Sequence, residues 1–170
     1  PNLILLPAVA AKLSIPILAS GGIGNGYQMA AAFALGAEGI NMGTRFVATQ
    51  EAPVHDNVKQ ALVAADERQT TLVFRSLNNT ARAFKNNIAA EVIRIESRPG
   101  ATNFADLQPL VTGSRGREEV LEKGDIDGGL WTAGMVMGLI YDIPTCDELL
   151  KRIVAEAREA AEKRVSLLLS

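Results

Sequence analysis

The stretch PILASGGIGNG, residues 16–26, passes from an apolar run into a glycine-rich loop within a few residues. Its apolar part, residues 17–19, is typical of a strand that is buried on both faces. A helical pattern follows over 26–35, with Asn25 as a plausible N-cap and Gly36 as the C-terminal stop. We therefore predict a strand, a glycine loop and a helix in direct succession.

A second stretch, AEGINMGTRF (residues 37–46), repeats the first half of this pattern. Residues 39–42 read as another buried strand that ends at a glycine, and clustered apolar residues over 1–13 suit a short helix before the first strand. A strand, a helix and a strand in this order form a βαβ unit, which predicts a parallel sheet with a right-handed crossover.

The remaining chain has a different pattern. We predict a helix over 54–66, a lone strand over 70–75 and a helix that runs from Ala81 to Ile95 on its apolar spacing. Loop and short helix are expected over 99–127, and a glycine-interrupted apolar helix over 130–140. Thr145 and Glu148 form a capping box ahead of a long amphipathic helix. The simplest division is barrel units at 1–50, a mostly helical inserted subdomain at 51–125 and returning helices at 126–170.

Composition excludes several classes of protein. Of 170 residues, 48% are hydrophobic and 21% charged, with a formal net charge of −2, which is typical of a globular domain without a basic nucleic-acid-binding face. Cys146 is the single cysteine, so an internal disulfide and a cysteine metal cluster are excluded, and a reducing, cytoplasmic compartment is expected. No apolar run approaches the roughly 20 residues of a membrane helix. We expect no metal, no nucleic acid and no membrane partner.

Two glycine loops carry the chemistry: Ser20-Gly21-Gly22 and Met42-Gly43-Thr44. A parallel strand that ends in glycine leaves backbone N–H groups free to bind an anion, and glycine lets a phosphate approach them closely. In a (β/α)8 barrel the loops after strands 7 and 8 form the usual phosphate site, and two consecutive loops fit it. A Rossmann fingerprint has different glycine spacing, and a Walker A loop needs a Gly-Lys-Ser/Thr sequence that does not follow here. The simplest alternative is that both loops are only turns.

The residues of these loops resemble a known family. PILASGGIGNG, the segment AAAFALGAEGINMGTRFVATQEAPVH, and the later RSLNNTARAFKN and GDIDGGLWTAGMVMGLI are similar to the FMN-dependent nitronate monooxygenase family, also called 2-nitropropane dioxygenase-like proteins. The first two segments are shared widely among flavin barrels. The later two look most like a subgroup of NAD(P)H:quinone reductases.

The resemblance implies the C-terminal half of an α/β (β/α)8 TIM barrel, namely its last two strands with the inserted subdomain. It implies FMN as cofactor and assigns one set of residues to it: Ser20, Gly21, Gly22, Met42, Gly43, Thr44 and Met135. Many members carry glutamine where this chain has Met135. The family's catalytic histidine lies upstream of the match to Pro1, so no catalytic residue is expected in this chain, and the N-terminal half of the same protein is an expected partner.

The implied reaction is oxidation of alkyl nitronates by oxygen through the flavin. The alternative is NAD(P)H:quinone reduction on the same scaffold, with a nitronate or a quinone as the small-molecule substrate, and a homodimer is compatible with either. A flavin-free phosphate-binding barrel and a non-catalytic fragment are the remaining hypotheses.

Five further side chains invite a functional interpretation and are better explained by structure. His55, the single histidine, is expected at a helix start as a surface or capping residue. Trp131 is expected in the core rather than on the flavin. Arg75 and Arg82 are read as solvated or structural, although a nicotinamide cofactor's phosphate is an alternative partner. Cys146 has no nearby base, which argues against a nucleophile.

Overall fold

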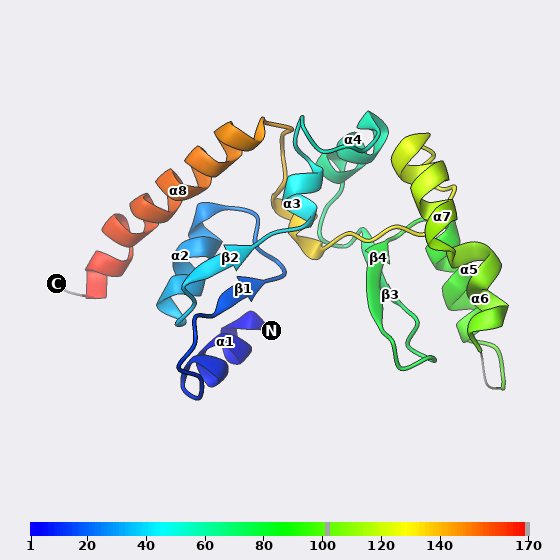
Figure 1. The fold of residues 1–170 in the computed structure, drawn as a ribbon, viewed down its shortest axis with the longest axis horizontal. Coiled ribbons are helices and arrows are strands. Elements are labelled where there is room, and N and C mark those ends of the chain that lie inside the picture. The colour runs from blue at the N-terminus through cyan, green and yellow to red at the C-terminus, as the bar shows by residue number, and fades with distance from the viewer. Residues whose placement is uncertain (101–102, 169–170) are drawn as a thin grey trace.

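The computed structural model describes residues 1–100 and 103–168, which form a mixed α/β fold (Figure 1). The chain begins with α1 (Asn2–Ala10), β1 (Leu18–Ser20), α2 (Gly26–Ala34) and β2 (Gly39–Asn41). β1 and β2 pair in parallel, with Leu18 opposite Gly39 and Ser20 opposite Asn41. The predicted βαβ unit is therefore confirmed.

Local signals fix both ends of α2. The Asn25 side chain accepts a hydrogen bond from the Gln28 N–H at 3.0 Å, as an N-cap does. Gly36 has φ +97°, and its N–H donates to the Phe33 carbonyl. A positive φ at this position favours glycine, so the helix ends where the sequence predicted.

The middle of the chain contains α3 (Thr44–Val47), α4 (Asp56–Ala64) and an antiparallel hairpin of β3 (Thr70–Val73) and β4 (Ala81–Phe84). The prediction of a lone strand at 70–75 was therefore wrong, as was the start of the following helix at Ala81. The turn between the strands has positive φ at Phe74 and Asn78. The apolar residues at 81 and 84 fit a helical spacing, but cross-strand pairing with β3 decided their conformation.

Four helical segments follow the hairpin in the described residues before position 125. α5 (Asn87–Glu96) begins at the N-cap Asn86, whose side chain accepts from the Ala89 N–H at 2.9 Å. α6 (Phe104–Val111), α7 (Gly113–Arg115) and the π-helical η1 (Gly116–Glu122) complete this part. The 51–125 region thus holds a β-hairpin besides its helices.

The segment 130–140 differs from the predicted apolar helix. Residues 130–134 are extended, and Thr132 forms a bridge with Ala83 while the Phe84 N–H donates to the Trp131 carbonyl at 3.0 Å. Only η2 (Met135–Leu139) is helical, as a short 3₁₀ turn. The helix prediction was wrong because pairing with β4, distant in sequence, extends the first half of the segment.

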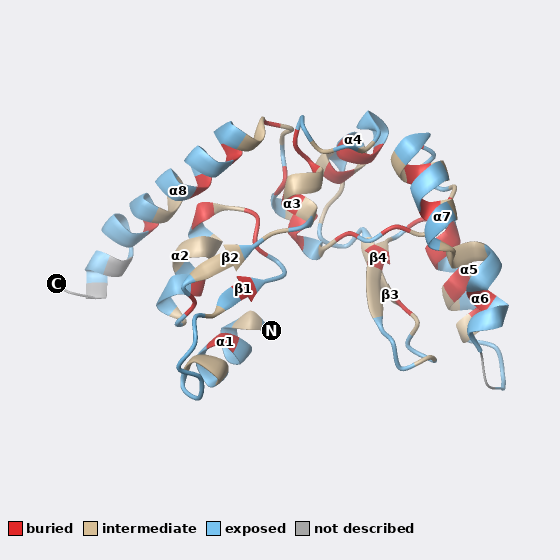
Figure 2. Cartoon of the chain, in the orientation of Figure 1, coloured by how far each residue is buried: buried red, intermediate tan, exposed pale blue. Residues whose placement is uncertain are grey.

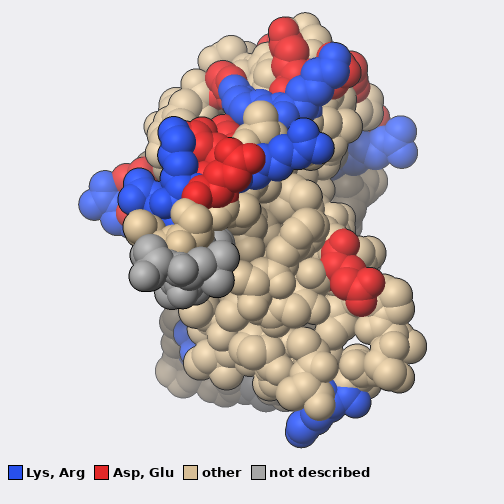
Figure 3. Space-filling model, turned by 90° about the vertical axis from the view of Figure 1, so that its left-hand side faces the viewer, with Lys and Arg blue, Asp and Glu red and all other residues tan. Residues whose placement is uncertain are grey.

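α8 (Cys146–Lys163) begins at the predicted capping box of Thr145 and Glu148, and η3 (Val165–Leu168) follows it. α8 lies along α2, where the Gly26 N–H donates to the Glu156 carboxylate at 2.8 Å. A Cβ at Gly26 would collide with backbone atoms of α8, so glycine permits this close approach. Figure 3 shows Lys, Arg, Asp and Glu side chains gathered on one part of this side of the molecule, above a broad surface that is nearly free of charge.

Buried residues form three clusters along the chain (Figure 2). One lies between α1, β1 and α2, a second between β3, β4, α5 and α6, and the third joins α4, η1 and the 131–140 segment. No helix among residues 1–100 and 103–168 is long and apolar enough to cross a membrane.

Candidate functional site

The two glycine loops lie side by side at the carboxyl ends of β1 and β2. The parallel register puts Ser20 opposite Asn41, and the Asn41 amide donates to the Ser20 hydroxyl at 3.3 Å. The chain therefore leaves the sheet twice at the same edge, each time through a glycine.

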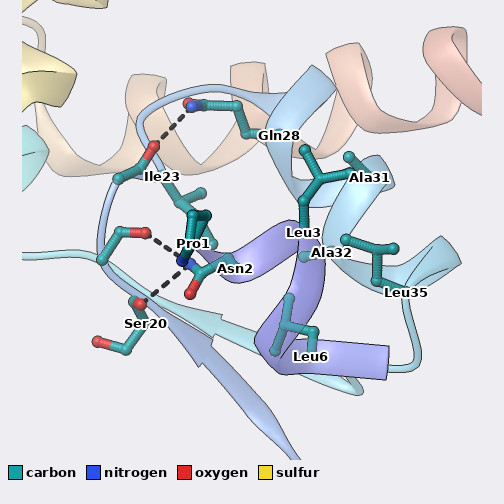
Figure 4. Close-up of a pocket in the computed structure, with 12 residues that line it drawn as sticks. Pro1, Asn2, Leu3, Leu6, Ser20, Ile23, Gln28, Ala31, Ala32 and Leu35 are labelled. Atoms are coloured by element: carbon teal, nitrogen blue, oxygen red, sulfur yellow. Dashed lines mark hydrogen bonds between the residues drawn. The ribbon is translucent and has the colours of Figure 1, made fainter. Parts of the chain in front are cut away.

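The first loop borders open space, and side-chain amides bind its carbonyl oxygens. Gly21 and Gly22 have φ of +88° and +75°, and a Cβ on either would meet no atom within 4 Å. The Asn2 amide donates to the carbonyls of Ser20 and Gly21 at 3.2 and 2.8 Å, and the Gln28 amide donates to the Gly22 carbonyl at 2.5 Å (Figure 4). Because these amides occupy its carbonyl oxygens, the loop is suited to offer N–H donors to an anion.

The second loop is equally open at its glycine. A Cβ on Gly43 would also meet no atom within 4 Å, and its φ of −101° is accessible to any residue. The Thr44 hydroxyl accepts from the Gly134 N–H at 2.9 Å, so its own proton is available to a further acceptor. The partly buried Met42 packs against the cluster between α1, β1 and α2.

Residues 132–136 lie beside both loops. Gly22 and Met135, which is 48% exposed, line one hollow together with Gln28, and Gly43 and Thr44 line another together with Gly134. The structure therefore brings all seven sequence-predicted residues to one edge of the sheet. The side chains that surround this edge are mostly uncharged.

A buried arginine anchors the second loop from below. Arg45 is 2% exposed, and its guanidinium donates to the carbonyls of Ala48 and Asp142 at 2.7 and 2.9 Å and to the Asp142 carboxylate at 3.3 Å. Arg152 of α8 binds the same carboxylate at 2.5 and 3.1 Å. Burial lowers the pKa of Arg45, the Asp142 carboxylate opposes this effect, and hydrogen bonding from Arg152 lowers the pKa of Asp142.

Sequence reasoning missed Asn2, Gln28 and Arg45. Gln28 had a signal, because Asn25 and Gln28 have the spacing of a capping box. Its side chain instead reaches back along the loop, where it also accepts from the Gly24 N–H at 2.8 Å. Asn2 and Arg45 carry no local signal, since their partners lie far along the chain.

The remaining candidates behave as structural residues. The His55 ring accepts from the Asn57 N–H at 3.1 Å and caps α4. Trp131 is 6% exposed and stacks on Phe84 with ring centroids 4.3 Å apart, so the prediction that it belongs to the core is confirmed. The Cys146 N–H donates to the Glu51 carboxylate at 2.9 Å, which lowers the pKa of Glu51.

These features define an α/β protein whose two glycine loops follow neighbouring parallel strands and lie at one end of the sheet. The family model for nitronate monooxygenase matches residues 2–156, and the chain belongs to this family.

Relatives and solved structures agree with this membership. A CoA dehydrogenase of Rhodococcus jostii (strain RHA1), which acts on a hydroxy-methyl-oxo-octahydro-indene-carboxyl-CoA, is 29% identical over 91% of this chain and 53% of its own length. A nitronate monooxygenase of Paraburkholderia phytofirmans is 29% identical over 91% of this chain and 41% of its own length. The chain thus spans about half the length of the curated relatives it matches.

Among solved structures, FabK from Thermotoga maritima has a TM-score of 0.87 and 34% identity over 95% of this chain and 50% of FabK. A nitroalkane oxidase from Streptomyces ansochromogenes has a TM-score of 0.74 and 30% identity over 95% of this chain and 44% of its own.

Proposed function

We propose that the two glycine loops bind the phosphate of FMN and that the intact protein is a flavin-dependent oxidoreductase. One observation carries the proposal: Gly21, Gly22 and Gly43 border open space at one end of the sheet. The amides of Asn2 and Gln28 bind the carbonyl oxygens of the first loop, which leaves its N–H groups as the donors for a ligand. In this proposal β1 and β2 are the last two strands of a (β/α)8 barrel. The 51–125 region is then its inserted subdomain, and 126–170 returns to the barrel.

Each residue has a separate task in this site. The backbone of Ser20, Gly21 and Gly22 holds the phosphate from one side, and that of Met42 and Gly43 holds it from the other. The Thr44 hydroxyl donates one hydrogen bond, and Met135 covers the neighbouring hollow with an apolar side chain. FMN, when bound, supplies the redox chemistry, so this chain's part is to bind and orient it.

The family and the names of its relatives favour nitronate oxidation by oxygen as the first candidate reaction. Met135 favours a second candidate, NAD(P)H:quinone reduction. Its exposed thioether presents an apolar, polarisable surface beside Gly22, which suits a quinone ring better than a charged nitronate.

The proposal is tested by flavin retention in the intact protein. Gly43→Val keeps an allowed backbone conformation and meets no neighbour, so the fold is expected to survive while the added methyl groups block the anion. Gly113→Val is the matched control, because a Cβ at Gly113 also meets nothing within 4 Å and α7 contributes no residue to the site.

We expect Gly113→Val to purify with the visible absorbance of the wild-type flavoprotein and Gly43→Val to lose it, with equal far-UV circular dichroism. Stoichiometric flavin in Gly43→Val would exclude the phosphate assignment. Steady-state rates with an alkyl nitronate and oxygen, compared with NADH and a quinone, decide between the two reactions.

A further inference from the structure

A second hollow, separate from the glycine loops, follows the edge of β3 that no strand pairs within the described residues. Its walls are β3, the turn after it, and the end of α5. The polar residues that line it carry hydroxyl or guanidinium groups apart from one carboxylate: Thr70, Thr71, Arg75, Ser76, Arg82, Glu96 and Ser97.

The one carboxylate in this hollow already has its hydrogen-bond partners. Glu96 accepts from the N–H groups of Phe74 and Ser76 at 2.9 and 3.0 Å, and from the Ser76 hydroxyl at 2.6 Å. These hydrogen bonds fix the turn that contains Arg75. Within residues 1–100 and 103–168, neither Arg75 nor Arg82 forms a salt bridge, and Glu96 is the one carboxylate that lines the hollow with them, so the charge of the hollow is net positive.

Arg82 connects this hollow to the glycine loops. It lies on β4 opposite Leu72, and its guanidinium donates to the Thr70 hydroxyl at 2.8 Å, which holds the side chain across the hairpin. Arg82 also lines the hollow that contains Gly43 and Thr44. An elongated molecule that binds at the hairpin would therefore extend toward the proposed flavin site.

We infer that Arg75 and Arg82 form a binding subsite for the pyrophosphate of a nucleotide-bearing substrate. Planar guanidinium groups bind phosphate oxygens with paired hydrogen bonds, and neighbouring hydroxyls donate to the remaining oxygens. The reactive end of the substrate then lies toward Gly43 and Thr44. The inference rests on the proposed function for its direction toward the flavin, whereas the anion subsite itself depends on the hairpin alone.

Two classes of substrate carry this group: a nicotinamide dinucleotide, which would reduce the flavin, and a coenzyme A thioester. Both present a pyrophosphate several bonds away from the reacting atoms, and Arg82 lines both the hairpin hollow and the hollow of Gly43 and Thr44.

The test titrates inorganic pyrophosphate into the intact flavoprotein at low ionic strength by calorimetry. We expect Arg75→Gln and Arg82→Gln each to weaken binding about tenfold, and the double variant to lose measurable binding. Arg158→Gln removes the same charge from the exposed side of α8 and is expected to change nothing. Arg82→Lys keeps the charge but loses the paired geometry, so an intermediate affinity is expected.

Competition separates the two sources. Displacement of pyrophosphate by NADPH or NADH identifies a dinucleotide, and displacement by coenzyme A alone identifies the thioester. Unchanged pyrophosphate affinity in the double variant, or no displacement by any of these molecules, would overturn the inference. A failure of the flavin proposal is seen separately, as absence of visible absorbance, because the Arg75 and Arg82 dependence of pyrophosphate binding is measured without turnover.

Discussion

The βαβ unit (α1 to β2) and the hairpin unit (β3 to α6) differ in how far they bury their apolar residues. In the hairpin unit, one face of β3 and β4 packs against α5 and α6, and Val73, Ala83 and Val92 are fully or almost fully buried. In the βαβ unit the outer edges of the two strands are unpaired within the described residues. Large apolar side chains of this unit are exposed: Leu3, Ile4, Leu5, Leu13, Ile15, Leu18, Tyr27 and Phe33.

The difference follows from sheet type. An antiparallel hairpin with helices on one face completes its own core, whereas parallel strands are normally buried on both faces and between neighbouring strands. The unit that carries the proposed cofactor loops therefore leaves more apolar surface for contacts beyond itself than the unit that carries Arg75 and Arg82, whose strand β4 also pairs with Thr132.

The largest expected effect of this contrast is self-association. The 170-residue chain expressed alone should form oligomers or aggregates at micromolar concentration, because unpaired edges and apolar surface attract other chains. Sedimentation velocity measures this, and Leu3→Gln combined with Ile4→Gln should reduce it. A monodisperse monomer with a single cooperative melting transition would show that the βαβ unit needs no partner.

The hairpin unit should respond strongly to a cavity in its own core. Leu107 of α6 is fully buried, so Leu107→Ala should lower the free energy of unfolding by about 2–5 kcal/mol. Phe104→Ala removes an exposed side chain from the same helix and should cost no more than about 0.5 kcal/mol. Urea unfolding of the intact protein measures both, and equal effects would contradict a self-contained core.

A smaller effect is expected where α8 stabilises the second loop. Asp142 receives hydrogen bonds from Arg152 and Arg45, which depress its pKa below the unfolded value of about 3.9. A depressed pKa stabilises the fold above pH 4, and this stabilisation is lost as the pH falls through the folded value.

Asp142→Asn should therefore reduce stability by about 1 kcal/mol at pH 7, since the carboxylate is half exposed and solvent screens the pair. The two proteins should converge below pH 4 in thermal melts that are recorded as a function of pH. A constant difference down to pH 2 would mean that the charge of Asp142 is not responsible.

The smallest effect is expected at His55. The side chain caps α4, so His55→Ala should leave turnover of the intact enzyme within a few-fold of wild type. A drop of about 10²–10⁴, the usual contribution of a general acid–base group, would place the reacting groups near α4 instead of at the sheet edge.

Local chemistry explains which parts of the structure the sequence predicted. Strand, glycine loop and helix in the βαβ unit, the Asn25 cap and the Thr145–Glu148 box each depend on residues a few positions apart. The hairpin and the extended 130–134 segment depend on pairing between distant residues, which overrode a helical apolar spacing.

The candidate site divides in the same way. The glycine loops were found because glycine after a buried strand is a local signal. The side chains that hold these loops were not found from the sequence, because their partners are distant in the chain. Asn2 donates a hydrogen bond to Gly21, 19 residues away, and Arg45 donates one to Asp142, 97 residues away.

The stacked pair of Phe84 and Trp131 gives the molecule an optical reporter. Trp131 is the single tryptophan, and its ring joins β4 of the hairpin unit to the segment that continues to Met135. Within these 170 residues its emission therefore reports the local environment of one junction. Because a bound isoalloxazine ring absorbs at wavelengths where tryptophan emits, cofactor loading would be followed as quenching of the Trp131 signal in real time.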